Sequence, residues 1–288
     1  MQATLRLTAA ALFTAFALSL QAQDQPASPA PAKPETLAQR QQEAWKMLSD
    51  AVLEDKRPEV RTQALSALSD LGQSARANRL IAQAMKDPDL DVRSAALVAA
   101  GHAKASRLLP NAHKLLDDPE PQVVYTAAVI LWRDFHDHSG EDILDAIVSG
   151  DRKTKPTLIH GAEHQMSSTM HSPATMAKLG VTQGAGMLLG PFGFSIMAIE
   201  YIRKSGTDTS RSIALELLAE AHTPASRDYL MDALSDKDQG VRATGARFLG
   251  KTHDRRYATA LAPLLEDDKQ PVRFSAAAAY INCTQQLP

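Results

Sequence analysis

The chain has 288 residues, of which 44% are hydrophobic and 22% are charged, and its formal net charge at pH 7 is −2. Without a basic excess it cannot neutralise many phosphates, so we expect no nucleic-acid partner. The single cysteine, Cys283, excludes an intramolecular disulfide and is interpreted as a small apolar residue of the last helix.

Residues 1–22 have the pattern of a secretory signal peptide. Arg6 precedes the apolar run Leu7–Leu20, and cleavage is expected before Gln23. The run is short for a transmembrane span, which needs about 20 apolar residues. We therefore expect an exported protein, periplasmic or extracellular.

Residues 23–35 are rich in Pro and Ala and predict an extended linker, so the folded part should cover residues 36–288. The first predicted helix, Thr36–Glu54, has no repeat motif before it. We expect it to cap the open N-terminal end of the fold, with Trp45 packed in the core.

The remaining chain is organised by a recurring frame in which Asp is followed five residues later by Val-Arg. The frame occurs as Asp55 with Arg61, Asp87 with Arg93, Asp236 with Arg242 and Asp267 with Arg273, while Asp118 precedes Val123-Val124 and Ser205 precedes Ser210-Arg211. Frame valines of neighbouring units lie 31 or 32 residues apart. This period predicts an all-α, right-handed solenoid of about seven helical hairpins.

The frame also has a local interpretation. Asp87 is expected to cap the helix that follows, Pro88 to occupy its first position and Gly101 to end it. A second, partner helix in each unit carries apolar residues in register. Because each frame Arg should lie near the Asp of the next unit, stacking should build a ladder of charge-assisted hydrogen bonds.

This skeleton resembles the HEAT-repeat family, particularly its short variety, the phycobilin lyase HEAT-like repeats. The resemblance rests on the Asp, Val and Arg positions of the frame and covers nearly everything after residue 35. It implies a solenoid but no activity, because such folds have many unrelated roles.

The third unit carries large aromatic side chains, although aromatics make up only 5% of the chain. On such solenoids the framed helices are expected to line one curved face and to expose positions two, nine and ten after the frame Val. Here those positions hold Tyr125, Trp132 and Arg133, with His102 beside them, and they are our candidates for binding a partner. Trp132 could equally belong to the core.

Position ten is expected to be solvated in every unit, where it holds Asp70, His102, Arg133, Glu220 and Lys251. A degenerate fourth unit is expected from Thr154, and there position ten is His164. With His160 and Glu163 it matches the His-x-x-Glu-His pattern of zinc-binding inverzincins, with Glu200 as a conceivable third ligand. A chance match is the favoured interpretation, so no metal or cofactor is expected.

Residues 180–204 form a Gly-rich apolar insert, and no charge occurs from Leu179 to Ile199. Gly190-Pro191-Phe192-Gly193 predicts a turn between two short pieces. A hairpin folded against the solenoid is the favoured interpretation, and membrane contact or a partner-binding loop are the alternatives.

The last frame leads into a helix with Phe274, Tyr280 and Ile281, and no partner helix follows it. An uncapped terminal repeat exposes apolar surface. We therefore expect the C-terminal end either to fray or to form a homodimer.

The favoured function is a non-catalytic scaffold that binds another protein through the curved face. The first alternative is a zinc-dependent hydrolase that uses His160, Glu163 and His164. The second is a structural protein of the cell envelope that contacts the membrane through residues 180–204.

Overall fold

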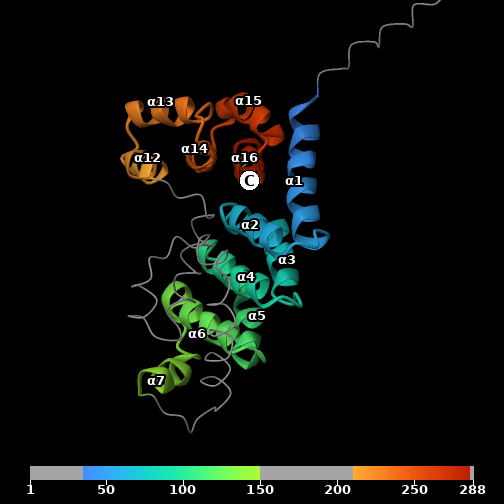
Figure 1. The fold of residues 1–288 in the computed structure, drawn as a ribbon, viewed down its shortest axis with the longest axis vertical. Coiled ribbons are helices and arrows are strands. Elements are labelled where there is room, and N and C mark those ends of the chain that lie inside the picture. The colour runs from blue at the N-terminus through green and yellow to red at the C-terminus, as the bar shows by residue number, and fades with distance from the viewer. Residues whose placement is uncertain (1–34, 150–209, 286–288) are drawn as a thin grey trace, which may run out of the picture. The chain divides into compact units, whose positions relative to one another are not determined.

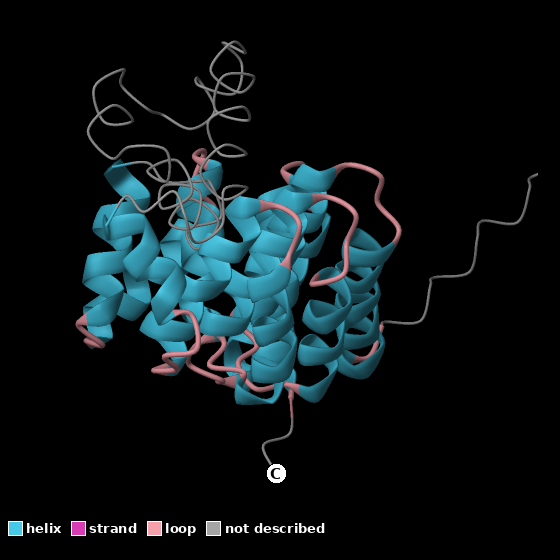
Figure 2. Cartoon of the chain, turned by 90° about the horizontal axis from the view of Figure 1, so that it is seen from below, coloured by secondary structure: helices cyan, strands magenta, loops and turns pink. Residues whose placement is uncertain are grey.

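The computed structural model describes residues 35–149 and 210–285, which form twelve α-helices and no strand (Figures 1 and 2). From Leu37 onward these helices belong to one compact unit. None of the described helices is both long and apolar enough to cross a membrane. The predicted signal peptide and linker, His160, Glu163, His164 and residues 180–204 lie outside the described residues.

Two kinds of helix alternate along the chain. The helices that follow a frame, called framed helices here, are α2 (Pro58–Ser69), α4 (Leu90–His102), α6 (Pro121–Phe135), α12 (Ser210–Glu220), α14 (Gln239–Gly250) and α16 (Gln270–Thr284). The partner helices are α1 (Leu37–Leu53), α3 (Ala75–Ala84), α5 (Leu109–Lys114), α7 (Glu141–Ser149), α13 (Pro224–Ala233) and α15 (Ala258–Leu261). Short 3₁₀ turns flank α5 and α15.

Framed helices pack directly against one another. The contacting pairs are α12 with α14, α14 with α16, α16 with α2, α2 with α4, and α4 with α6. Each partner helix packs mainly on framed helices, and the apolar residues expected at its buried face are inaccessible, as at Leu80, Leu230 and Leu261. The described part of the chain is therefore an α-solenoid, as the repeat period predicts.

The two ends of the folded chain meet. Helix α16 packs along α1 and α2 (Figure 1), and its Tyr280 and Ile281 have no accessible surface. Gln41 Nε2 donates a hydrogen bond to Thr284 Oγ1 at 3.0 Å, and Asn282 Nδ2 donates to the Asp70 carbonyl at 2.9 Å. Helix α1 is thus the partner helix of α16.

This arrangement corrects two predictions. The first helix does not cap an open N-terminal end, and the C-terminal helix is not uncapped, because the two unpaired apolar stripes bury each other. In space the hairpins follow the order α12–α13, α14–α15, α16–α1, α2–α3, α4–α5, α6–α7. The ends of the described stack therefore lie at α12 and α7, on either side of residues 150–209.

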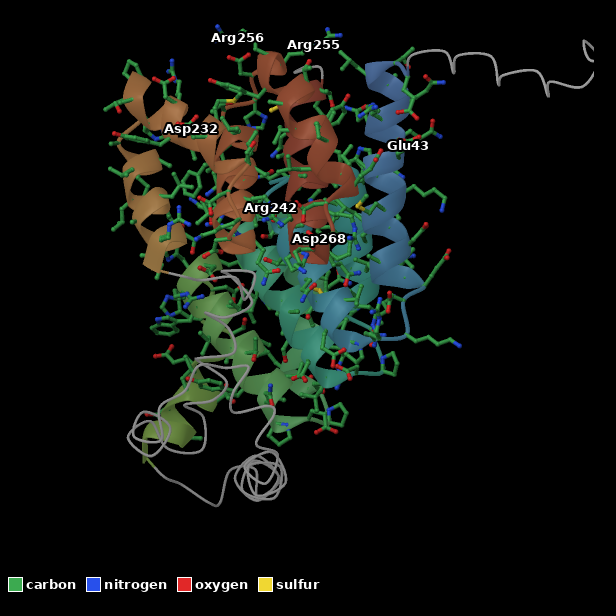
Figure 3. All side chains as sticks on the ribbon, turned by 45° about the horizontal axis from the view of Figure 1, so that its top comes forward. Glu43, Asp232, Arg242, Arg255, Arg256 and Asp268 are labelled. Carbon is green, nitrogen blue, oxygen red and sulfur yellow. The ribbon has the colours of Figure 1, made fainter. Side chains whose placement is uncertain are left out.

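The predicted ladder of Arg–Asp pairs is confirmed. Arg93 Nε and Nη2 donate to the two carboxylate oxygens of Asp118 at 2.9 and 2.8 Å, and Arg242 binds Asp267 in the same bidentate way. Figure 3 shows Arg242 close to Asp268, which lies 3.4 Å from it. Two bonds also join Arg211 to Asp236, and a single bond from Arg61 Nη2 reaches Asp87 at 3.0 Å.

The ladder is interrupted where the chain ends meet. Arg273 donates to the carbonyl of Asp267, as Arg61, Arg93 and Arg242 do to the frame Asp carbonyls of their own units. The Asp of the next unit in space, Asp55, is instead held by Arg57 at 2.9 Å. Apolar packing, rather than an ion pair, therefore joins α16 to α1 and α2.

The expected capping roles within the frame are wrong in detail. The carboxylate of Asp87 accepts from the backbone N–H of Asp89, and Asp89 is the residue that caps α4. Pro88 precedes the helix rather than beginning it. Gly101 lies inside α4, where a Cβ atom would come within 2.7 Å of Asp134 Oδ2, so it permits close contact between α4 and α6.

Two single residues behave as the sequence predicts. Trp45 is buried, with the Arg76 guanidinium 4.6 Å from its ring centroid. Cys283 is buried next to the Leu249 carbonyl, and burial raises the pKa of its thiol to about 11. A thiol with this pKa stays protonated near pH 7, so Cys283 is a core residue.

We expect Arg93→Ala to lower the free energy of unfolding by about 3 kcal/mol or more, because it leaves the carboxylate of Asp118, only 5% exposed, without its partner. Urea denaturation measures this loss. Arg57→Ala is the matched control, since its pair with Asp55 is solvent-exposed and should contribute far less to stability. Equal losses in the two variants would contradict the structural role of the ladder.

We also expect residues 36–149 and 210–288, produced together as separate chains, to copurify, because α16 is held by α1 and α2 across the junction of the two ends. Affinity capture of one tagged fragment tests this. A first fragment that lacks α1 and starts at residue 54 should lose most of the association. Association that does not depend on α1 would show that the two ends do not meet in this way.

Candidate functional site

The residues at position ten after the frame fall at or just beyond the C-terminal ends of neighbouring framed helices. We call this set the C-terminal row, and in spatial order it consists of Glu220, Lys251, Asn282, Asp70, His102 and Arg133. The framed helices contact one another side by side, so the row crosses the described hairpins in succession. The sequence predicts that the partner binds on the face that carries this row.

Three of the four candidate residues lie together at one end of this row. His102 is half-buried at the end of α4, while Trp132 and Arg133 are exposed in the last turn of α6, which contacts α4 near Gly101. The prediction for Tyr125 is wrong, since it is only 8% exposed and lies about two turns from Trp132 on the same helix.

The structure explains why positions two and nine are buried. Both positions face neighbouring framed helices and hold small or buried residues, such as Ser94 and Ser212 at position two and Gly101, Ala219 and Gly250 at position nine. Trp132 is the exception at position nine. It is 39% exposed because α6 is the last framed helix on this side of the described stack.

Each accessible side chain of this cluster has a neighbour that orients it. The rings of Trp132 and His138 meet edge to face, with centroids 4.1 Å apart. Arg133 Nη2 lies 3.2 Å from Asp134 Oδ2, and His102 Nδ1 is 2.7 Å from the Ser69 hydroxyl. The cluster therefore offers one aromatic surface, one guanidinium and one imidazole.

A second group of charges lies beside the row and was missed by the sequence analysis. Arg247 of α14 pairs with Glu216 of α12 at 3.2 Å, and its side chain is only 10% exposed. These residues occupy position six of their units, a position to which the sequence analysis assigned no role. Their burial depends on how α12 and α14 pack.

Asp70 departs most from its expected solvation. Its Oδ1 atom is buried and has no hydrogen-bond partner among the described residues. Burial raises the pKa of Asp70. The electrostatic effects of Arg247, His102 and Lys251 act to lower this pKa, but burial is the larger effect. The row thus contains a carboxyl group whose ionisation costs more free energy in the folded protein than in the unfolded chain.

The described part of the row and the adjacent Trp132 offer hydrogen-bonding groups, charges and one exposed aromatic ring. Within residues 35–149 and 210–285, no three His, Cys, Asp or Glu side chains gather in a way that could hold a metal ion. The His-x-x-Glu-His candidates are outside these ranges.

Comparison with known proteins agrees with this architecture. Residues 197–281 match the family model of HEAT repeats. The matched stretch ends in α16 and includes α12, α13, α14 and α15, so it supports the predicted HEAT-like fold. The phycobilin lyase variety stays a prediction.

Among solved structures, human deoxyhypusine hydroxylase in complex with glycerol is similar to this chain. The sequences are 19% identical, and the alignment covers 83% of this chain and 95% of the hydroxylase with a TM-score of 0.33. A similarity at this level carries no argument about activity. The search among curated proteins gave no match.

We expect Asp70→Asn to raise the melting temperature at pH 7. The pKa of Asp70 is higher in the folded protein than in the unfolded chain, where it is about 4. The stability that Asp70 contributes is therefore complete below the unfolded pKa and is lost as pH rises through the folded pKa. Melting curves from pH 4 to 8 should show the gap between variant and wild type widening with pH. An Asn variant that is no more stable at pH 7 would contradict the cost of ionising Asp70.

Proposed function

We propose that this protein is an exported, non-catalytic scaffold that holds another protein against the C-terminal row of its framed helices. HEAT repeats commonly mediate protein–protein interactions, because stacked hairpins offer a long continuous surface. The observation that carries the proposal is the exposed pair Trp132 and Arg133, next to His102 on the adjacent helix.

The composition of this cluster supports contact with protein. Trp and Arg are among the residue types that contribute most to protein interfaces. Trp132 is 39% exposed but already oriented by His138, so little side-chain entropy would be lost when a partner covers it. An indole that is exposed to solvent contributes less to folding stability than a buried one. The exposure of Trp132 therefore favours a role in binding.

The charges along the row support specificity. Lys251 and Glu220 are exposed at one end and Arg133 at the other, so a partner meets charges of both signs along the row. Complementary charges of this kind select a partner and orient it more than they increase affinity. The partner should therefore carry both acidic and basic groups on its docking surface.

Export belongs to the same proposal and rests on the signal-peptide pattern of residues 1–22. Cleavage before Gln23 would leave the linker and the solenoid outside the cytoplasm. The partner is then sought in the cell envelope or the medium, and sequencing of the mature N-terminus from a periplasmic fraction checks this placement.

We expect Trp132→Ala combined with Arg133→Ala to reduce capture of envelope proteins at least tenfold while leaving the melting temperature nearly unchanged. Both side chains are exposed, and together they form the centre of the cluster. Affinity capture with the mature protein as bait, quantified by mass spectrometry, provides the measurement.

The matched control is Leu53→Ala combined with Arg79→Ala, which removes two exposed side chains from partner helices. It should capture the same proteins as the wild type. If the Trp132 and Arg133 variant also captures them in equal yield, the cluster of His102, Trp132 and Arg133 is not the binding surface.

A further inference from the structure

A pocket lies between the hairpin α12–α13 and the end of α14, away from Trp132. Its volume is about 330 Å³, within the range of pockets that hold a few side chains or a small ligand. The floor is apolar and buried, formed by Ala219, Leu230 and Phe248. We call it the α12–α14 pocket.

The rim of this pocket is mostly basic. Arg227 and Lys251 are exposed there, and the one carboxylate in the lining is Glu220. The Lys251 ammonium lies over Phe248, with Nζ 4.4 Å from the ring centroid, so it is held at the edge of the floor.

Neither rim cation is neutralised in the way that the ladder arginines are. No ion pair or side-chain hydrogen bond joins Arg227 or Lys251 to any residue of the described ranges. Asp254, whose charge is near Arg227, is already bound by Arg256 at 2.6 Å, and this bond lowers the pKa of Asp254. The rim therefore has positive charge available for a ligand.

The hairpin that forms one side of the pocket also exposes apolar side chains. Of the seven large hydrophobic side chains that are exposed in the described ranges, five belong to this hairpin: Ile213, Leu217, Leu218, Tyr229 and Met231. Exposed apolar groups gathered on one element and bordered by polar residues are typical of surfaces that bind protein. A small soluble anion would leave these groups uncovered.

We propose that the α12–α14 pocket binds an acidic segment of a partner protein, with a carboxylate between Arg227 and Lys251 and an adjacent apolar side chain on Phe248. This inference rests on the proposed scaffold function and adds the chemistry of the partner. The carboxylate supplies negative charge to the two rim cations, and the apolar neighbour fills the pocket above the apolar floor.

The test uses the mature protein and the peptide acetyl-Leu-Glu-Leu-Glu-Leu amide as the probe. Titration followed by NMR should shift backbone amides near Ala219, Arg227 and Lys251. The same peptide with Gln in place of Glu should bind at least tenfold more weakly, and binding of the acidic peptide should weaken as salt is raised.

Arg227→Glu combined with Lys251→Glu should weaken binding of the acidic peptide at least tenfold. Arg107→Glu combined with Lys114→Glu is the matched control, because it makes the same change in net charge at two exposed residues near α5. Arg227→Lys combined with Lys251→Arg keeps the charge and should keep the binding. Equal affinity of the reversed variant and its control, or amide shifts elsewhere, would overturn the inference.

The outcome is separable from that of the scaffold proposal. If the reversed variant binds the peptide weakly but captures envelope proteins as the wild type does, this pocket is not the docking site, and the scaffold proposal stands. If the reversed variant loses its partners while the Trp132 and Arg133 variant keeps them, the pocket is supported and the cluster of His102, Trp132 and Arg133 is not. Binding to phosphatidylglycerol vesicles without binding to the peptide would reject a protein ligand.

Discussion

The fold depends on burying the last helix of the chain. Helix α16 is apolar around most of its circumference, and burial of each large apolar side chain is worth about 1.5–3 kcal/mol. Helix α1, from the other end of the described chain, covers it together with α2. Without this contact, two apolar stripes would face water, and the described helices would form two separate stacks.

The Arg–Asp ladder has a different role from this apolar packing. Each bidentate pair joins one unit to the next and fixes how far one framed helix is shifted along its neighbour, because two parallel hydrogen bonds tolerate little displacement. The burial of each pair determines how much it contributes to the free energy of unfolding. Arg93 with Asp118 is nearly inaccessible, whereas Arg211 is 57% exposed at the end of the described stack. At Asp236 the bond from Arg211 lowers the pKa to about 2, so this pair is intact above pH 4 and is lost as pH falls toward 2.

The two proposed binding regions lie where this packing of framed helices stops. Trp132 and the apolar residues of α12–α13 are exposed because they lie at the two ends of the described stack, where no further framed helix covers them. Both proposed binding regions therefore follow from the same physical fact, that a solenoid leaves its terminal units incompletely buried. They differ in chemistry, since one offers an indole with a guanidinium and the other an apolar floor with two cations.

The sequence by itself determined the repeat, because a period of about 31 residues, the Val-Arg frame and the apolar stripes are local patterns. It therefore predicted the helices, the ladder and the buried roles of Trp45 and Cys283. It could not show that α16 and α1 pair, since they lie at opposite ends of the chain and no local pattern links them. Nor could it show that Tyr125 is buried and Trp132 exposed, because accessibility depends on which neighbouring helix covers each position. Only the tertiary structure decided where the stack ends and which side chains remain free to bind.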